Sequence, residues 1–306
     1  MSDLPYGPME EVRVAPETAI AANRANWDDR AGVHAASRDY DLEGFVADPG
    51  RISTVVREDL PLLAPHLPGG SLEGLDAVHL QCHLGTDTLS LARLGARVTG
   101  VDLSPRSLEV ARDLARRAGL PARFVECEVT RAAEVLGEQH ADVVYTSVGA
   151  ICWVADLAAW GRTVAALLRP GGVFYLRDAH PFLTPFDDSL PLREDGTGAL
   201  VPRYRYFGDG WAHTYDEPVT YTDGHHGRIE HGRNYEWPHP VSEVVTVLLD
   251  AGLRLVHLGE HRSLPWQALP QMRRVGEGWE LPADQRDQLP VAFSVAARRD
   301  RGPSAR

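Results

Sequence analysis

Asp102 is the residue whose type and position indicate chemistry most clearly. It follows the run Arg97–Val101, which predicts a strand, and lies about 20 residues beyond the turn that starts at Gln81. A carboxylate at the end of such a strand can accept hydrogen bonds from both hydroxyls of a ribose. The alternative role, a carboxylate that caps the next helix, is the weaker one because Ser104 already provides an N-cap.

The turn in front of Asp102 lacks most glycines of a dinucleotide-binding loop. Where the pattern G-x-G-x-x-G lets the backbone approach a pyrophosphate, this chain has Gln81, His83 and Gly85. Side chains at the first two positions suit a nucleoside without phosphates. The turn therefore favours S-adenosylmethionine and disfavours a nicotinamide cofactor.

The segments around the turn have the pattern of a doubly wound α/β sheet. Ala77–Leu80 predicts the first strand, and Thr86–Leu94 predicts the helix after it. Near-continuous apolar runs, typical of parallel strands covered on both faces, predict three more strands. These are Arg123–Cys127, Ala141–Thr146 and Val173–Asp178. Ser104 and Asp156 predict the starts of two more helices, and Gly119 predicts the end of the first of these.

Residues 77–180 resemble a class I S-adenosylmethionine-dependent methyltransferase. The resemblance rests on five fragments in the right order: Leu80–Gly85 (L-Q-C-H-L-G), Val98–Pro105, Phe124–Val129, Asp142–Trp153 and Leu167–Asp178. The first is similar to the degenerate L-Q-C-H-x-G motif of a bacterial branch that acts on small molecules. The resemblance implies a Rossmann-like fold, S-adenosyl-L-methionine as cofactor, and methyl transfer to oxygen, nitrogen or carbon of a small molecule.

A cofactor site follows from this resemblance and from the carboxyl edge of the predicted sheet, where such folds bind ligands. It comprises Tyr40, Gln81, His83, Gly85, Asp102, Leu103, Glu128, Val129, Ser147, Gly149 and Trp153. The resemblance implies that Leu103 packs on the adenine and that Val129 offers it a backbone N–H. It also implies that the Glu128 carboxylate accepts a hydrogen bond from the adenine amino group, with Glu126 as the alternative acceptor. His79 stands where relatives often have an acid that orients the amino group of the ligand.

Three aromatic residues allow two interpretations each. Tyr40 and Trp27 are expected near the pocket, because N-terminal helices of relatives close over the cofactor, or they pack against the sheet. Trp153 forms a wall of the adenine site or belongs to the core.

His180 is the first candidate for a general base. It follows the fifth strand, at the edge that faces the reacting methyl group, and an imidazole titrates near neutrality. In the alternative role, His180 bonds a backbone carbonyl and shapes the hinge of a lid. Tyr221 and His231 are weaker candidates, as are Asp178 and His239.

The composition restricts the partners and the chemistry. The 306 residues have a net charge of −12, which disfavours a nucleic-acid backbone as partner. All 31 basic residues are arginine, so Schiff-base and Walker lysine chemistry is excluded. Three cysteines, with no signal peptide or membrane-spanning run, predict a soluble, cytoplasmic protein with a small-molecule substrate. His225, His226 and His231 form too weak a pattern to predict a metal.

The chain is expected to have five parts. They are a helical cap (1–70), the cofactor-binding core (71–180), a lid insertion (181–240), the completion of the core sheet (241–300) and a tail (301–306). Met1–Pro16 is expected to be loose, and the lid strands are expected at Tyr204–Phe207, Glu217–Thr222 and Arg228–Tyr235. The predicted fold is a Rossmann-like doubly wound sheet, mostly parallel, with an antiparallel edge strand and an inserted antiparallel β lid.

Two other functions stay open. The scaffold can use another carbon of S-adenosylmethionine, or keep it as a structural ligand, which the degenerate turn at Gln81 and His83 suggests. It can also belong to a non-catalytic binding or regulatory protein, because a fold does not by itself define an activity.

Overall fold

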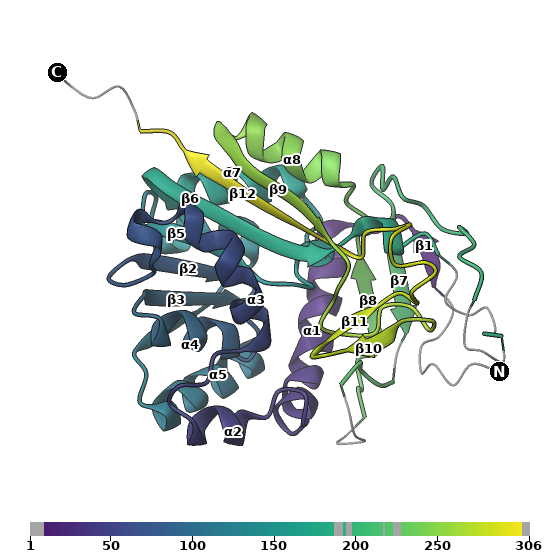
Figure 1. Ribbon diagram of the computed structural model, residues 1–306, viewed down its shortest axis with the longest axis horizontal. Helices are drawn as coiled ribbons and strands as arrows, with labels where there is room; N and C mark the ends of the chain where they lie inside the picture. The colour runs from purple at the N-terminus through teal and green to yellow at the C-terminus, as the bar shows by residue number, and fades with distance from the viewer. Residues whose placement is uncertain (1–8, 187–191, 194–197, 217, 223–227, 302–306) are drawn as a thin grey trace.

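The computed structural model describes residues 9–186, 192–193, 198–216, 218–222 and 228–301. Its centre is a seven-stranded sheet in the order β4-β3-β2-β5-β6-β12-β9 (Figure 1). The strands are β2 (Asp76–Leu80), β3 (Arg97–Asp102), β4 (Ala122–Glu126), β5 (Ala141–Thr146), β6 (Leu168–Ala179), β9 (Leu253–His261) and β12 (Ala292–Arg299). The pairs from β4 to β6 are parallel, and β12 runs antiparallel to both of its neighbours. The predicted fold class is confirmed, although the antiparallel strand lies one place inside the edge that β9 forms.

Helices cover both faces of this sheet. They are α1 (Pro16–Ala35), α2 (Leu42–Ala47), α3 (Thr54–Leu63), α4 (Thr86–Arg93), α5 (Pro105–Ala118), α6 (Ala132–Leu136), α7 (Leu157–Leu167) and α8 (Val241–Asp250). Because side chains alternate along a strand, Val78 packs with α7 and α8 while its neighbour Ala77 packs with α3 and α4. The predicted caps are present: Ser104 accepts from the Ser107 amide, and Asp156 accepts from the Ala159 amide.

A second sheet, the lid sheet, pairs β1 (Glu10–Val12) with β7 (Ala212–Asp216), and β7 with β8 (Arg233–Glu236). The expectation that Met1–Pro16 is loose is therefore wrong for Glu10–Val12, because that segment finds its partner about 200 residues along the chain. Helix α1 lies between the central sheet and the lid sheet and packs against α5 and β8 (Figure 1).

The lid strands differ from the predicted ones. Tyr204–Phe207 is bent and forms no strand; the Tyr206 ring packs on those of Phe207 and Phe182 instead of alternating with its neighbours along a ladder. Residues 218–222 form no strand, and Glu217 lies outside the described residues. The third predicted strand starts later than expected, at Arg233.

The segment between β9 and β12 was not anticipated from the sequence. It contains the hairpin of β10 (Arg273–Val275) and β11 (Gly278–Glu280), and its apolar side chains pack against the segment after β6.

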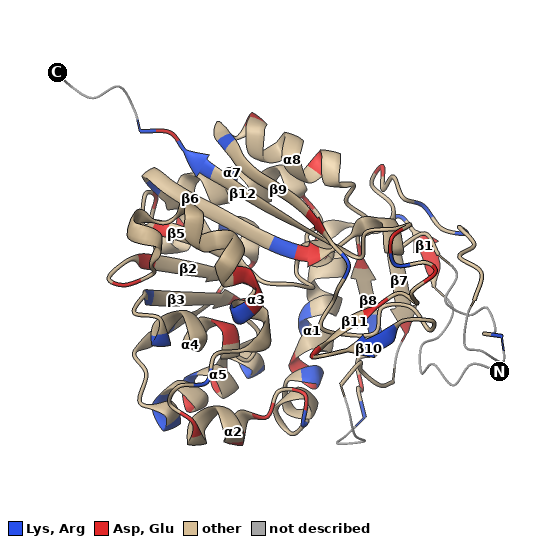
Figure 2. Ribbon diagram, in the orientation of Figure 1, with Lys and Arg blue, Asp and Glu red and all other residues tan. Residues whose placement is uncertain are grey.

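Acidic and basic segments are interspersed along the ribbon (Figure 2). Within the described ranges, no helix is both long and apolar enough to cross a membrane.

Candidate functional site

The turn between β2 and α4 keeps the backbone of a glycine-rich loop although two of its three key residues are not glycine. The φ angles of Gln81, His83 and Gly85 are 57°, 48° and 79°. A left-handed conformation costs a residue with a Cβ about 1–2 kcal/mol. At Gly85 a side chain is also excluded by space, because a Cβ there would lie 2.9 Å from the Ala111 Cβ. The turn therefore has the shape that a ligand-binding loop needs, at the cost of strain.

Asp102 holds this turn in place. Its Oδ2 accepts from the His83 amide at 2.7 Å, and its Oδ1 accepts from the Ser104 amide at 2.8 Å. Burial raises the pKa of Asp102 to about 6, against the lowering effect of these amides. A carboxylate has about four acceptor sites, and the Leu103 amide takes up part of that capacity as well, so acceptor capacity remains for a ligand. Ser104 caps α5, so Asp102 holds the turn and keeps the capacity to bind a ribose.

The loop after β5 is fixed in a similar way from β6. The Asp178 carboxylate accepts from the amides of Gly149, Ala150 and Ile151 at 2.5, 3.0 and 2.8 Å. The Trp153 indole donates to the Gly149 carbonyl at 2.9 Å. These bonds make Asp178 a structural residue, which argues against the weaker hypothesis that it is a base.

His79 and Gln81 connect the turn to the same loop. The buried imidazole of His79 bridges the hydroxyls of Thr88 and Ser147 at 2.8 and 3.1 Å. The Gln81 Nε2 donates to the Ala150 carbonyl at 2.8 Å. The two segments that follow the adjacent strands β2 and β5 are therefore held together, at the point where doubly wound sheets bind ligands.

Six rings from four segments meet over this point, and we call them the ring cluster. Its members are Trp27, His34, Tyr40, His83, Trp153 and Tyr221. Trp27 lies 5.0 Å from His83 and 5.1 Å from Trp153, measured between ring centroids. The Arg30 guanidinium lies over Trp27 and Trp153, at 5.2 and 5.9 Å. The structure thus brings together the predicted residues Tyr40, His83, Trp153 and Tyr221.

A chain of hydrogen bonds runs through the ring cluster. The Thr220 hydroxyl lies 2.7 Å from the His34 Nε2, and the His34 Nδ1 lies 2.8 Å from the His83 Nε2. The His83 Nδ1 lies 3.1 Å from the Ser107 hydroxyl. Burial, aided by the Arg30 charge, lowers the pKa of His83 to about 3 and that of His34 well below its usual value. Both imidazoles are therefore neutral at physiological pH.

The sequence analysis missed His34 and Arg30. Both lie on α1, where Arg30 is three residues after Trp27 and His34 four residues after Arg30, so they share one face of the helix. This spacing is the one sequence signal that links them, and it did not distinguish a ligand-facing side from a core-facing side.

The other predicted adenine-site residues lie at the ends of β3 and β4. Leu103 is half-buried, and Val129 is buried at the start of a short 3-10 helix. The Glu128 carboxylate caps that helix by accepting from the Thr130 amide at 2.9 Å. Its competitor Glu126 pairs with Arg24 of α1. The assignment of Glu128 to the adenine stays a prediction.

Two of the three predicted catalytic residues make their contacts elsewhere. His180 is buried, its Nδ1 accepts from the Phe182 amide at 3.1 Å, and its Nε2 lies 3.2 Å from the Glu260 carboxylate. His231 is exposed and lies 3.0 Å from the Asp29 carboxylate. The Tyr221 hydroxyl lies 3.0 Å from that of Tyr40. The imidazole of His180 bonds a backbone amide and not the carbonyl that the alternative role specified, and its contacts lie in the segment after β6.

The described residues contain no group of three His, Cys, Asp or Glu side chains placed to hold a metal, and His225 and His226 lie outside them.

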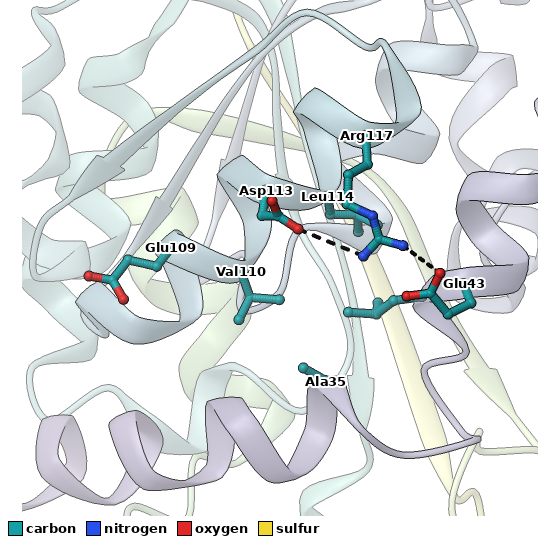
Figure 3. A pocket seen from close by; sticks show the side chains of 8 residues that line it. Ala35, Glu43, Glu109, Val110, Asp113, Leu114 and Arg117 are labelled. Carbon is teal, nitrogen blue, oxygen red and sulfur yellow. Dashed lines mark hydrogen bonds and ion pairs between the residues drawn. The ribbon is translucent and has the colours of Figure 1, made fainter.

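A hollow of about 330 Å³ lies between the end of α1, α2 and α5 (Figure 3). There Arg117 bridges Glu43 and Asp113. None of the residues predicted to bind cofactor lines this hollow.

Solved structures with this arrangement define the class of fold. A putative S-adenosylmethionine-dependent methyltransferase from Listeria monocytogenes is 18% identical, with a TM-score of 0.56 over 80% of this chain and 98% of that one. An S-adenosylmethionine-dependent methyltransferase from Mesorhizobium loti is 22% identical, with a TM-score of 0.50 over 79% and 97%. The fold is that of class I methyltransferases.

Sequence comparisons show which proteins this chain is similar to. Residues 77–172 match the model of a family described as a methyltransferase domain. A ubiquinone biosynthesis O-methyltransferase from Methylobacterium sp. (strain 4-46) is 39% identical over 34% of this chain and 41% of its own length. A protein of the same name from Proteus mirabilis is 35% identical over 46% and 55%. The chain spans about half the length of the curated relatives it matches. Residues 77–172 are therefore similar in sequence to a methyltransferase domain.

Proposed function

We propose that this protein transfers a methyl group from S-adenosyl-L-methionine to a small-molecule acceptor. The observation that supports this most is the left-handed turn at Gln81, His83 and Gly85, bonded to a carboxylate with free acceptor capacity. The name of the relatives, O-methyltransferase, favours oxygen as the atom methylated. The net charge of −12 disfavours a nucleic-acid substrate.

The residues around the turn fit the parts of this cofactor. Asp102 would accept from the ribose hydroxyls, while Leu103, Val129 and Glu128 would hold the adenine. The Gln81 Oε1 is buried and, among the described residues, has no hydrogen-bond partner. A buried acceptor of this kind favours a donor from the ligand, and the ammonium of the methionine part is one. Arg30 is always charged and close to the turn, so it suits the carboxylate of that part.

Bound in this way, the cofactor would supply an activated methyl group. The task of the protein is then to place the nucleophile of the acceptor about 3 Å from that methyl group, in line with the bond that breaks. Ser147 and Gly149, after β5, lie at the edge where the acceptor would enter. Removal of the acceptor proton by His180 stays a hypothesis, with Tyr221 and His231 as the weaker candidates.

The alternatives from the sequence have less support. The degenerate turn suggested that the scaffold uses another carbon of S-adenosylmethionine or keeps it as a structural ligand. The backbone of the turn keeps the left-handed φ angles at the degenerate positions Gln81 and His83, so the substitutions leave the shape of the loop intact. Mass spectrometry of the product would separate methyl transfer from the use of another carbon.

Calorimetry with S-adenosylmethionine and S-adenosylhomocysteine tests the proposal. We expect micromolar binding of both, and a weaker affinity in Asp102→Ala but not in Asp113→Asn, a matched control on the exposed side of α5. No binding of either compound at millimolar concentration would contradict the proposed function and favour a regulatory protein.

We infer that the protein works in the cytoplasm. Cys82, Cys127 and Cys152 are all free thiols, as is usual in a reducing compartment. Fractionation of the cells that produce the protein would test this.

A further inference from the structure

The ring cluster lies next to the position that the reactive sulfur of the proposed cofactor would take. His83 follows β2, Trp153 follows β5, and Trp27 of α1 contacts both rings across the gap between the two strands. The Asp102 carboxylate, which would hold the ribose, accepts from the amide of His83 itself. In S-adenosylmethionine the sulfonium is joined to the ribose through a single carbon. A ribose at Asp102 therefore brings the sulfonium next to His83 and Trp27.

The ring cluster already attracts a positive charge in this structure. The Arg30 guanidinium lies 5.2 Å from the centroid of Trp27 and 5.9 Å from that of Trp153, within the range of cation–π attraction. The side chain of Arg30 is buried, so water screens this attraction little. Both indoles thus already lie against a cation, the Arg30 guanidinium.

The two histidines of the cluster do not oppose a cation. A protonated imidazole next to a sulfonium would repel it, because like charges a few ångströms apart interact strongly in a buried site. Burial and the charge of Arg30 lower the pKa of both His34 and His83, so their rings are neutral. Neutral rings add polarisable, electron-rich surface, so the competing positive charge in the cluster is that of Arg30, which the carboxylate of the methionine part would balance in the proposed complex.

We propose that the ring cluster is a charge-selective subsite, which binds the sulfonium of S-adenosylmethionine better than the neutral sulfur of S-adenosylhomocysteine. This inference rests on the proposed function, because it concerns the same site. During transfer, the nucleophile of the acceptor forms a bond to the methyl carbon, and the electron pair of the carbon–sulfur bond returns to sulfur. The sulfur becomes a neutral thioether, and the cluster loses its attraction for it. The subsite therefore favours exchange of spent cofactor for fresh cofactor.

The test compares the dissociation constants of three ligands by calorimetry. They are S-adenosylmethionine, S-adenosylhomocysteine and the unreactive analogue sinefungin, which has an ammonium near the position of the sulfonium. We expect the wild-type protein to bind the two cations more tightly than S-adenosylhomocysteine. In Trp27→Leu, which keeps an apolar side chain without a ring, this preference should fall about 3- to 30-fold, the range of a cation–π interaction. Trp27→Phe should give an intermediate value.

A matched control is Trp211→Leu, because Trp211 also lies beneath arginines, Arg13 and Arg205, but next to the lid sheet. That variant should keep the wild-type preference. Equal weakening of all three ligands in Trp27→Leu would overturn charge selectivity, since it would mean that Trp27 only packs. A wild-type protein that binds all three equally would also overturn it and leave the proposed function intact. A wild-type protein that binds none of them would overturn the proposed function itself.

Discussion

Two aspartates of the central sheet each hold the loop that follows an adjacent strand, but they differ in how much acceptor capacity remains. Asp102, the last residue of β3, accepts from the His83 amide in the turn after β2 and from the Ser104 amide, while Asp178 in β6 accepts from amides in the loop after β5. Asp178 also accepts from its own neighbour, the Ala179 amide, so four amides share its buried carboxylate. Asp102 accepts from the amides of His83 and Ser104, is also bonded by that of Leu103, and is only half-buried. A carboxylate saturated by the backbone shapes a loop, whereas one with acceptors to spare can also bind a ligand.

The comparison predicts the largest effect at Asp178. In Asp178→Ala several buried amides lose their acceptor, and each buried unsatisfied group costs about 1–3 kcal/mol. We expect the free energy of unfolding to fall by about 3–5 kcal/mol. Urea denaturation measures it, with Asp178→Asn as the control that keeps one carbonyl oxygen and loses less. A loss below about 1 kcal/mol would mean that the loop after β5 is held by other contacts.

Asp102→Ala should affect binding more than stability. Because charge-assisted bonds to the ribose are lost, we expect the affinity for S-adenosylhomocysteine to fall by about 1–3 kcal/mol. The midpoint of unfolding should move less than it does in Asp178→Ala. The dissociation constant and the denaturation curve of the same preparation check both statements. An unchanged dissociation constant in the folded variant would refute the ribose assignment.

The pH dependence of ligand binding tests whether Asp102, unlike Asp178, uses its carboxylate to bind a ligand. Burial raises the pKa of Asp102 to about 6, and only the ionised carboxylate accepts from both hydroxyls. The affinity should be constant above about pH 7 and should fall up to about tenfold per unit below pH 6. The stability contribution has the opposite sign: with a raised pKa in the folded state, this residue favours folding at low pH, and that benefit is lost as the pH rises through about 6. Calorimetry from pH 5 to 8 tests the binding, and an Asp102→Asn variant should show a flat profile.

His180 should give the smallest effect. It lies two residues beyond Asp178, and its contacts with the Phe182 amide and Glu260 are those of a structural residue. We expect His180→Ala to change turnover by less than about tenfold, whereas loss of a general base costs about 10²–10⁴-fold. Turnover with a suitable acceptor measures this. A loss in the larger range, with a changed pH profile, would make His180 the base.

The core was predictable because its signals are local. Apolar runs predicted β5 with its observed bounds and the neighbouring strands to within a few residues, and Ser104, Gly119 and Asp156 marked helix ends where the structure has them. The lid was not predictable in the same way. Its strand β1 is defined only by pairing with β7, and Tyr204–Phe207 has the composition of a strand but is bent.

The sequence by itself determined the central sheet, the turn between β2 and α4 and the position of Asp102, since periodicity and spacing along a few dozen residues decide these features. Only the tertiary structure decided which aspartate is saturated, where His180 makes its contacts, and that Trp27, Arg30 and His34 lie over the turn. The physical reason is distance along the chain: α1, the turn and the lid meet through side chains that are 50 to 200 residues apart. No local pattern encodes such contacts, because they form only when the sheet has brought their elements together.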